Sequence, residues 1–141
     1  MCKMAKSQII CVVDDEPAIR ETLENVLSDE GHPVMSCRDS EDFYAKLEKQ
    51  TPALVLLDIW LPGTDGMAIL SQLRETHPDI PVIMMSGHAG IDAAVNAIKL
   101  GAVDFLEKPL RLEILLNKIS IVLSNKTPKK TDLISKERSG S

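Results

Sequence analysis

Five short apolar runs alternate along the chain with segments in which apolar residues recur at helical spacing. This alternation strongly constrains the fold, because it is typical of repeated βα units whose strands form one parallel sheet. The first, third and fourth runs are almost continuously apolar, as expected of strands that helices cover on both faces. The sequence therefore predicts an α/β fold with strands near residues 8–13, 33–37, 53–58, 81–86 and 103–107.

The segments after these runs predict five helices, near residues 17–30, 40–50, 66–77, 91–100 and 111–123. Pro17 suits the first turn of the first helix, and Gly31 directly follows its end. Asp39 or Ser40 can cap the second helix. The fourth helix offers as its apolar face Ile91, Ala94, Val95 and Ile98.

Length and composition exclude several classes of protein. The 141 residues suffice for one domain with a substantial core, and the net charge of −5 argues against contact with nucleic acid. No apolar stretch approaches the roughly 20 residues that span a bilayer, and the amino-terminal apolar run is too short for a signal peptide. Cys2, Cys11 and Cys37 are odd in number and lack metal-ligand spacing, which favours reduced cysteines and a cytoplasmic location.

The composition changes near Ser124, after which the chain is polar and charged with little periodic apolar content. Such a segment cannot bury enough apolar surface to form a core of its own. We therefore expect a folded domain over residues 7–125 and a linker or disordered tail over residues 126–141.

Ionisable and hydroxyl side chains stand where four of the predicted strands end. Asp14 and Asp15 follow the first strand, Asp58 ends the third, Ser86 ends the fourth and Lys108 follows the fifth. Parallel strands end on one edge of a sheet, and ligands bind in the crevice outside it, so these residues are expected to converge. Like charges about 4 Å apart cost roughly 4 kcal/mol at an effective dielectric constant near 20. Three carboxylates there favour a bound cation, and their oxygens suit Mg²⁺.

Charge balance favours a phosphoryl group in the same pocket. Three carboxylates, one divalent cation and one ammonium are neutral together, and an aspartyl phosphate at Asp58 adds about one negative charge for donors such as Ser86 to hold. Each residue also has an ordinary structural interpretation: Asp15 as a helix cap, Lys108 as a solvated lysine and Ser86 as a loop hydroxyl. Their joint occurrence at four strand ends favours the functional interpretation.

Four segments resemble the receiver domain of bacterial response regulators, over about residues 7–123. They are VVDDE at 12–16, LLDIWLPGTDG at 56–66, MMSGH at 84–88 and GAVDFLEKPL at 101–110. Each is a modest signal alone, whereas their order and spacing together are specific. The resemblance implies a flavodoxin-like, doubly wound receiver fold, with five helices around a five-stranded parallel sheet of strand order 2-1-3-4-5.

The resemblance also implies a role for each strand-end residue. Asp58 would accept a phosphoryl group from the phosphohistidine of a sensor histidine kinase. Asp14, Asp15 and Asp58, with the backbone carbonyl of Trp60, would hold Mg²⁺. Lys108 would bind a phosphoryl oxygen, and its peptide bond to the following proline would be cis.

A switch is implied as well. The Ser86 hydroxyl would also bind the phosphoryl group, and Phe105 would turn inward and repack the surface formed by the fourth helix, the fifth strand and the fifth helix. Because Phe105 has no hydroxyl, it would act by packing alone; its ordinary interpretation is a core residue. Trp60 could shield the phosphoryl group from water, while His88 could orient a water or be simply exposed.

The segments SGHAGIDAAVNAIKLGA and GAVDFLEKP look most like the nitrogen-regulator type of receiver, which precedes a transcription-activating output. No GxxxxGK[ST] phosphate loop and no basic helix-turn-helix segment is present, so such an output is expected in a longer parent protein. A homodimer through the fourth and fifth helices is plausible. The other interpretation is a stand-alone phosphorelay receiver.

Two other classes are weaker matches. A phosphatase of the haloacid-dehalogenase type also uses a strand-end aspartate with Mg²⁺, but it needs a second aspartate two residues later, where this chain has Trp60. A flavin-binding module would need a phosphate loop rich in serine and threonine, and the predicted pocket is anionic. We therefore expect a signalling domain and not an enzyme.

Overall fold

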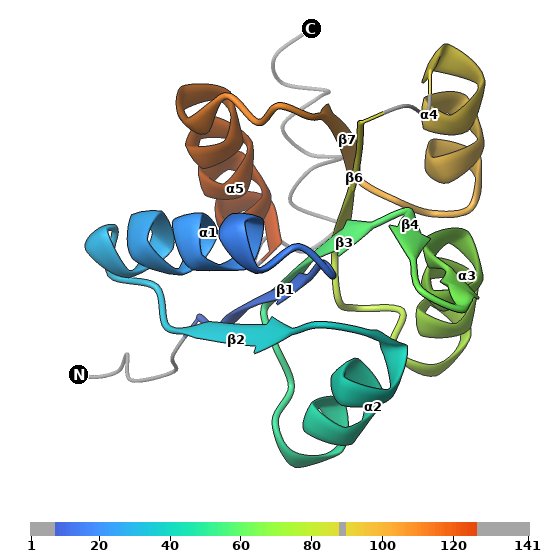
Figure 1. Ribbon diagram of the computed structural model, residues 1–141, viewed down its shortest axis with the longest axis horizontal. Helices are drawn as coiled ribbons and strands as arrows, with labels where there is room; N and C mark the ends of the chain where they lie inside the picture. Colours follow the sequence, from blue (N-terminus) through green and yellow to red (C-terminus); the bar gives the residue numbers. More distant parts are fainter. Residues whose placement is uncertain (1–7, 88–89, 127–141) are drawn as a thin grey trace, which may run out of the picture.

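The computed structural model describes residues 8–87 and 90–126 (Figure 1). Its five parallel strands are β1 (Ile10–Val13), β2 (Val34–Cys37), β3 (Leu54–Asp58), β6 (Val82–Ser86) and β7 (Asp104–Glu107). They form one sheet in the order β2-β1-β3-β6-β7, and each strand runs parallel to its neighbours. Since β6 and β7 are the fourth and fifth strands of this sheet, the predicted strand order 2-1-3-4-5 is confirmed.

Two further strands, β4 (Trp60–Leu61) and β5 (Thr64–Asp65), form a small antiparallel hairpin that the sequence does not predict. Pro62 and Gly63 make its turn, and Gly63 has a φ of 72°. A Pro-Gly pair suits a two-residue turn whose second residue needs a positive φ. The hairpin leads the chain from β3 to the third helix along the edge where the strands end.

The helices are α1 (Pro17–Asp29), α2 (Ser40–Lys49), α3 (Gly66–Thr76), α4 (Gly90–Lys99) and α5 (Leu112–Lys126). Their starts lie within one residue of the predicted ones, and α5 continues three residues beyond its predicted end. Asp39 caps α2, since its Oδ1 accepts a hydrogen bond from the backbone N–H of Asp42 at 2.8 Å. Among the described helices, none is both long and apolar enough to cross a membrane.

Helices cover both faces of the sheet (Figure 1). Alternate residues of β1 point to opposite faces, so Ile10 and Val12 pack with α1 and α5, whereas Cys11 and Val13 pack on the side of α2, α3 and α4. Each face of the sheet therefore has its own apolar core. Because helices cover both faces, every residue of β1, β3 and β6 is buried.

Helix α4 does not pack against the sheet through the apolar face that the sequence predicts. Ala97 is its only fully buried residue, and Ala93 packs against the same core. Ile91 is 80% exposed, and Val95 and Ile98 are each 48% exposed. The small residues face the sheet edge at β7, and the larger apolar residues face outward.

Candidate functional site

The strand-end residues lie on one edge of the sheet. Asp14 follows β1 directly, Asp58 is the last residue of β3 and Ser86 is the last residue of β6. These three strands are successive neighbours, and β7, which precedes Lys108, lies next to β6. The backbone N–H of Lys108 donates to the carbonyl of Ser86 at 2.9 Å. Residues separated by up to 94 positions thus meet at the carboxyl edge, as parallel topology requires.

Three carboxylates meet at this edge. One oxygen from each of Asp14, Asp15 and Asp58 lies within 4.8 Å of the others. Asp14 is fully buried and Asp58 is 3% exposed, whereas Asp15 faces solvent. Buried carboxylates this close repel one another and need compensating positive charge. A set of hard oxygen donors that is open to water on one side fits Mg²⁺, which keeps several of its waters.

Lys108 brings positive charge to the cluster. Its Nζ lies 2.9 Å from Asp14 Oδ2 and 3.3 Å from Asp58 Oδ2. A further carboxylate, that of Glu16, places Oε1 3.2 Å from the same nitrogen. The Lys108 side chain is only 15% exposed, so salt screens these ion pairs less than surface pairs. The sequence predictions do not include Glu16. Its place as the third consecutive acid of the VVDDE segment was the signal that could have identified it.

Burial and neighbouring charges shift the pKa values of Asp58 and Lys108. Burial raises the pKa of Asp58 to about 6, and the charge of Asp14 adds to this effect while Lys108 opposes it. Burial by itself lowers the pKa of Lys108, but the carboxylates of Asp14 and Asp58 outweigh it and raise that pKa above its usual value. Lys108 is therefore charged at neutral pH, and Asp58 is an ionised carboxylate above about pH 6.

Hydrogen bonds fix Asp14 from three sides. Its backbone N–H donates to the carbonyl of Cys37 at 3.1 Å, and its own carbonyl accepts from Arg20 Nη1 at 2.7 Å. Its Oδ1 accepts from the backbone N–H of Glu16 at 2.9 Å. Because β1 ends at Val13, the chain has left the strand before Asp14, which allows successive acids to line one pocket. Asp14 is thereby tied to both β2 and α1.

Close backbone packing fixes Asp58. Its Oδ1 accepts from the backbone N–H of Trp60 at 3.3 Å. A Cβ on Gly66, the first residue of α3, would collide with the carbonyl oxygen of Asp58 and lie 2.8 Å from Cα of Ile59. Only glycine allows α3 to begin this close to the strand, and the N–H of Gly66 donates to the carbonyl of Ile59 at 2.7 Å.

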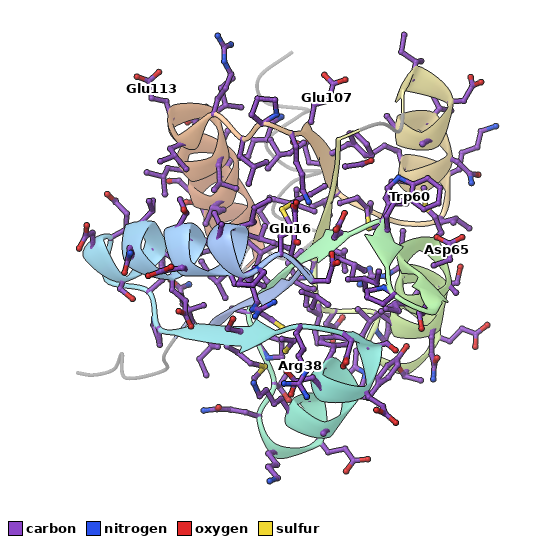
Figure 2. The ribbon with its side chains drawn as sticks, viewed as in Figure 1. Glu16, Arg38, Trp60, Asp65, Glu107 and Glu113 are labelled. Carbon is purple, nitrogen blue, oxygen red and sulfur yellow. The ribbon has the colours of Figure 1, made fainter. Side chains whose placement is uncertain are left out.

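The remaining predicted residues lie around this centre. Ser86 is fully buried, and Trp60 is 60% exposed on the hairpin. Phe105 is half-buried and pairs in register with Met84, so it points to the same side of the sheet as Ser86. His88 lies outside the described residues. The predicted cis peptide bond between Lys108 and Pro109 is present. Figure 2 shows Glu16 from the start of α1 and Trp60 from the hairpin at this edge.

Comparisons with known proteins agree with this geometry. The pattern of the response regulator receiver domain matches residues 10–120. The nitrogen assimilation regulatory protein NtrX of Azorhizobium caulinodans is 43% identical over 106 residues, covering 74% of this chain and 23% of the relative. The DNA-binding transcriptional regulator NtrC of Salmonella typhimurium is 41% identical over 105 residues, covering 74% and 22%. The chain thus spans less than a quarter of the length of these relatives.

Solved structures of receiver domains are also similar. The receiver domain of NtrX from Brucella abortus has a TM-score of 0.78 and 44% identity, with 82% of this chain and 98% of that chain covered. The beryllofluoride-activated NtrC4 receiver domain dimer has a TM-score of 0.81 and 33% identity, covering 85% and 99%. The matched segment contains the whole sheet and all four strand ends described above. The chain therefore belongs to the response regulator receiver domain family.

Proposed function

We propose that this chain is the phosphoacceptor receiver of a two-component system, taking a phosphoryl group from the phosphohistidine of a sensor histidine kinase onto Asp58. The observation that carries this proposal is the position of the Asp58 carboxylate, which lies both in the three-carboxylate cluster and 3.3 Å from the Lys108 ammonium. An acceptor carboxylate between a cation site and a fixed ammonium suits in-line attack on phosphorus, because phosphoryl transfer depends on positioning and charge neutralisation.

Each residue of the pocket then has a separate task. Asp14, Asp15 and Asp58, with the backbone carbonyl of Trp60, would hold Mg²⁺, and the ion would neutralise charge on the transferred oxygens. Lys108 and the Ser86 hydroxyl would bind two of those oxygens. The Trp60 ring would hinder water from reaching the phosphoryl group. A protein of this kind would act in the cytoplasm, with residues 7–125 as the receiver and 126–141 as a linker or disordered tail.

The output of the switch would be the surface of α4, β7 and α5. Ser86 and Phe105 lie on the side of the sheet that faces α4, so movement of the hydroxyl toward Asp58 leaves space for Phe105 to turn inward. A pocket of about 450 Å³ opens between these elements, lined by Ile91, Phe105 and Ile114 among others. In this proposal the rearranged surface regulates a transcription-activating domain outside this chain.

The same surface would support a homodimer through helices 4 and 5. Ile91, Val95 and Ile98 of α4 and Ile114 of α5 are exposed, and apolar residues grouped on one face favour association. The NtrC4 receiver domain, a structural relative, is described as a dimer in its beryllofluoride-activated state. A stand-alone phosphorelay receiver is the alternative. A haloacid-dehalogenase-type phosphatase has less support, because Trp60 occupies the place of its second aspartate.

Intact-mass measurement after incubation with Mg²⁺ and acetyl phosphate tests the proposal. We expect a stable gain of one phosphoryl group in the unsubstituted chain and none in Asp58→Asn. Sustained release of phosphate with turnover would favour the phosphatase. No gain of mass would contradict the phosphoacceptor role and indicate a degenerate receiver.

A further inference from the structure

Glu16 has a contact that the proposed metal and phosphoryl roles do not use. Its Oε1 lies 3.2 Å from Lys108 Nζ, although the two residues are 92 positions apart in the sequence. Glu16 also stands at the N-cap of α1, yet its side chain makes no capping hydrogen bond. Glutamate is not among the preferred N-cap residues, which are mainly serine, threonine, asparagine and aspartate. The side chain therefore does not stabilise the helix start and instead pairs with the lysine.

The backbone holds Glu16 in place for this contact. Its N–H donates to Asp14 Oδ1 at 2.9 Å, so the residue is fixed relative to the buried acid of the cluster. Its φ of −87° and ψ of 114° are extended, and Pro17 follows it as the first residue of the helix. Proline restricts the preceding residue to extended backbone, which maintains this geometry. Glu16 is 58% exposed and approaches Lys108 from the solvent side of the pocket.

Lys108 has two kinds of carboxylate partner. Asp14 and Asp58 belong to the group whose oxygens lie within 4.8 Å of one another, and they are proposed metal ligands. Glu16 is outside that group in the described chain. A divalent cation in the cluster would draw Asp14 and Asp58 away from the ammonium and repel it. Glu16 is then the carboxylate that can still pair with Lys108.

We propose that Glu16 is a positioning residue that holds the Lys108 ammonium at the mouth of the pocket and thereby strengthens Mg²⁺ binding by Asp14, Asp15 and Asp58. This role rests on the proposed function of the cluster. Without Glu16, Lys108 relies on Asp14 and Asp58 alone and competes more strongly with the ion for them. Without Glu16, the repulsion between ammonium and ion also lacks a neighbouring anion to offset it. Both effects weaken binding.

Titration of the unphosphorylated chain with MgCl₂ tests this role, with binding measured by calorimetry and by the fluorescence of Trp60, the only tryptophan. We expect Glu16→Gln to weaken binding about three- to fivefold, the size expected of a partly exposed ion pair. Glu21→Gln removes the same charge from an exposed position on α1 and is the matched control. It should change affinity less than about twofold.

Repeating the comparison in a Lys108→Met background separates action through the lysine from a direct effect on the ion. Methionine keeps most of the aliphatic stem, and circular dichroism would verify that each variant is folded. If Glu16 acts through Lys108, the loss caused by Glu16→Gln should fall to that of the Glu21→Gln control. An equal loss in both backgrounds, or none in either, would overturn the positioning role alone. Absence of saturable Mg²⁺ binding in the unsubstituted chain would overturn the metal site and this role with it.

Discussion

Helices α1 and α4 each follow a strand that contributes to the site, yet they are held very differently. Helix α1 follows β1 and packs Leu23 and Leu27 with no exposed surface, whereas α4 follows β6 and fully buries only Ala97 among its described residues. Complete burial of a leucine side chain stabilises a fold by about 1.5–3 kcal/mol, and an alanine offers far less apolar area. One helix is therefore fixed against the sheet, and the other can shift at low cost.

This difference matches the tasks proposed for the two sides of the site. Asp14, a proposed metal ligand, is hydrogen-bonded to the backbone of Glu16 and to Arg20 at the start of α1, so the firmly packed helix holds it in place. The surface of α4 is proposed to rearrange, and elements that move are drawn from the less stable parts of a fold. In the proposed function, fixed ligands on one side and a loosely packed helix on the other would allow a change of charge in the pocket to rearrange the α4 surface without disturbing the ligands.

The largest expected effect tests the packing difference directly. Leu23→Ala should lower the free energy of unfolding by about 3–4 kcal/mol, because it leaves a cavity in the core beneath α1. Ile91→Ala removes an apolar side chain of similar size from α4, and it should change stability by no more than about 0.5 kcal/mol. Urea unfolding followed by circular dichroism measures both values. A loss above about 1.5 kcal/mol for Ile91→Ala would show that α4 is as firmly held as α1.

A second prediction concerns charge. Because the pKa of Asp58 is raised to about 6, the folded chain binds this proton more tightly than the unfolded chain. The stability that this group contributes is complete below about pH 4 and is lost as the pH rises to about 6. In EDTA at pH 7.5, Asp58→Asn should therefore raise the free energy of unfolding by roughly 1–3 kcal/mol. The gain should shrink steadily toward pH 4.5 in thermal or urea unfolding.

The substitution Asp92→Asn, on helix α4, is the control for the prediction about Asp58→Asn. Asp92 is exposed in the first turn of α4, and its substitution changes the net charge by the same amount. We expect a change within about 0.5 kcal/mol at either pH. Equal stabilisation by both substitutions would attribute the effect to net charge and not to repulsion inside the buried cluster.

The fold and the centre of the site could be predicted because they depend on topology. Alternating apolar runs place all five strands in one sheet, and parallel strands bring Asp14, Asp58 and Lys108 to one edge whatever the loops do. The hairpin of β4 and β5 could not be predicted, because two-residue strands are too short to show any periodicity.

The packing of α4 and the contact between Glu16 and Lys108 could not be predicted from the sequence, for physical reasons. The helix carries two sets of apolar residues at the same spacing, Ile91 and Val95 on one face and Ala93 and Ala97 on another, and periodicity alone does not say which one meets the sheet. The Glu16 contact depends on the direction in which one side chain points, and its place as the third consecutive acid of VVDDE signals only that it lies near the cluster.

The prediction with the smallest expected effect concerns what holds α1 in place. If packing and not capping fixes this helix, Glu16→Ala should lower the free energy of unfolding by less than about 0.5 kcal/mol, since its side chain makes only a partly exposed ion pair. Asp39→Ala in α2 removes a side-chain cap and should cost about 1 kcal/mol. Urea unfolding of the two variants in EDTA measures the difference. A loss for Glu16→Ala as large as that for Asp39→Ala would show that α1 depends on its N-cap residue as well as on Leu23 and Leu27, and the contrast with α4 would then extend to how each helix begins.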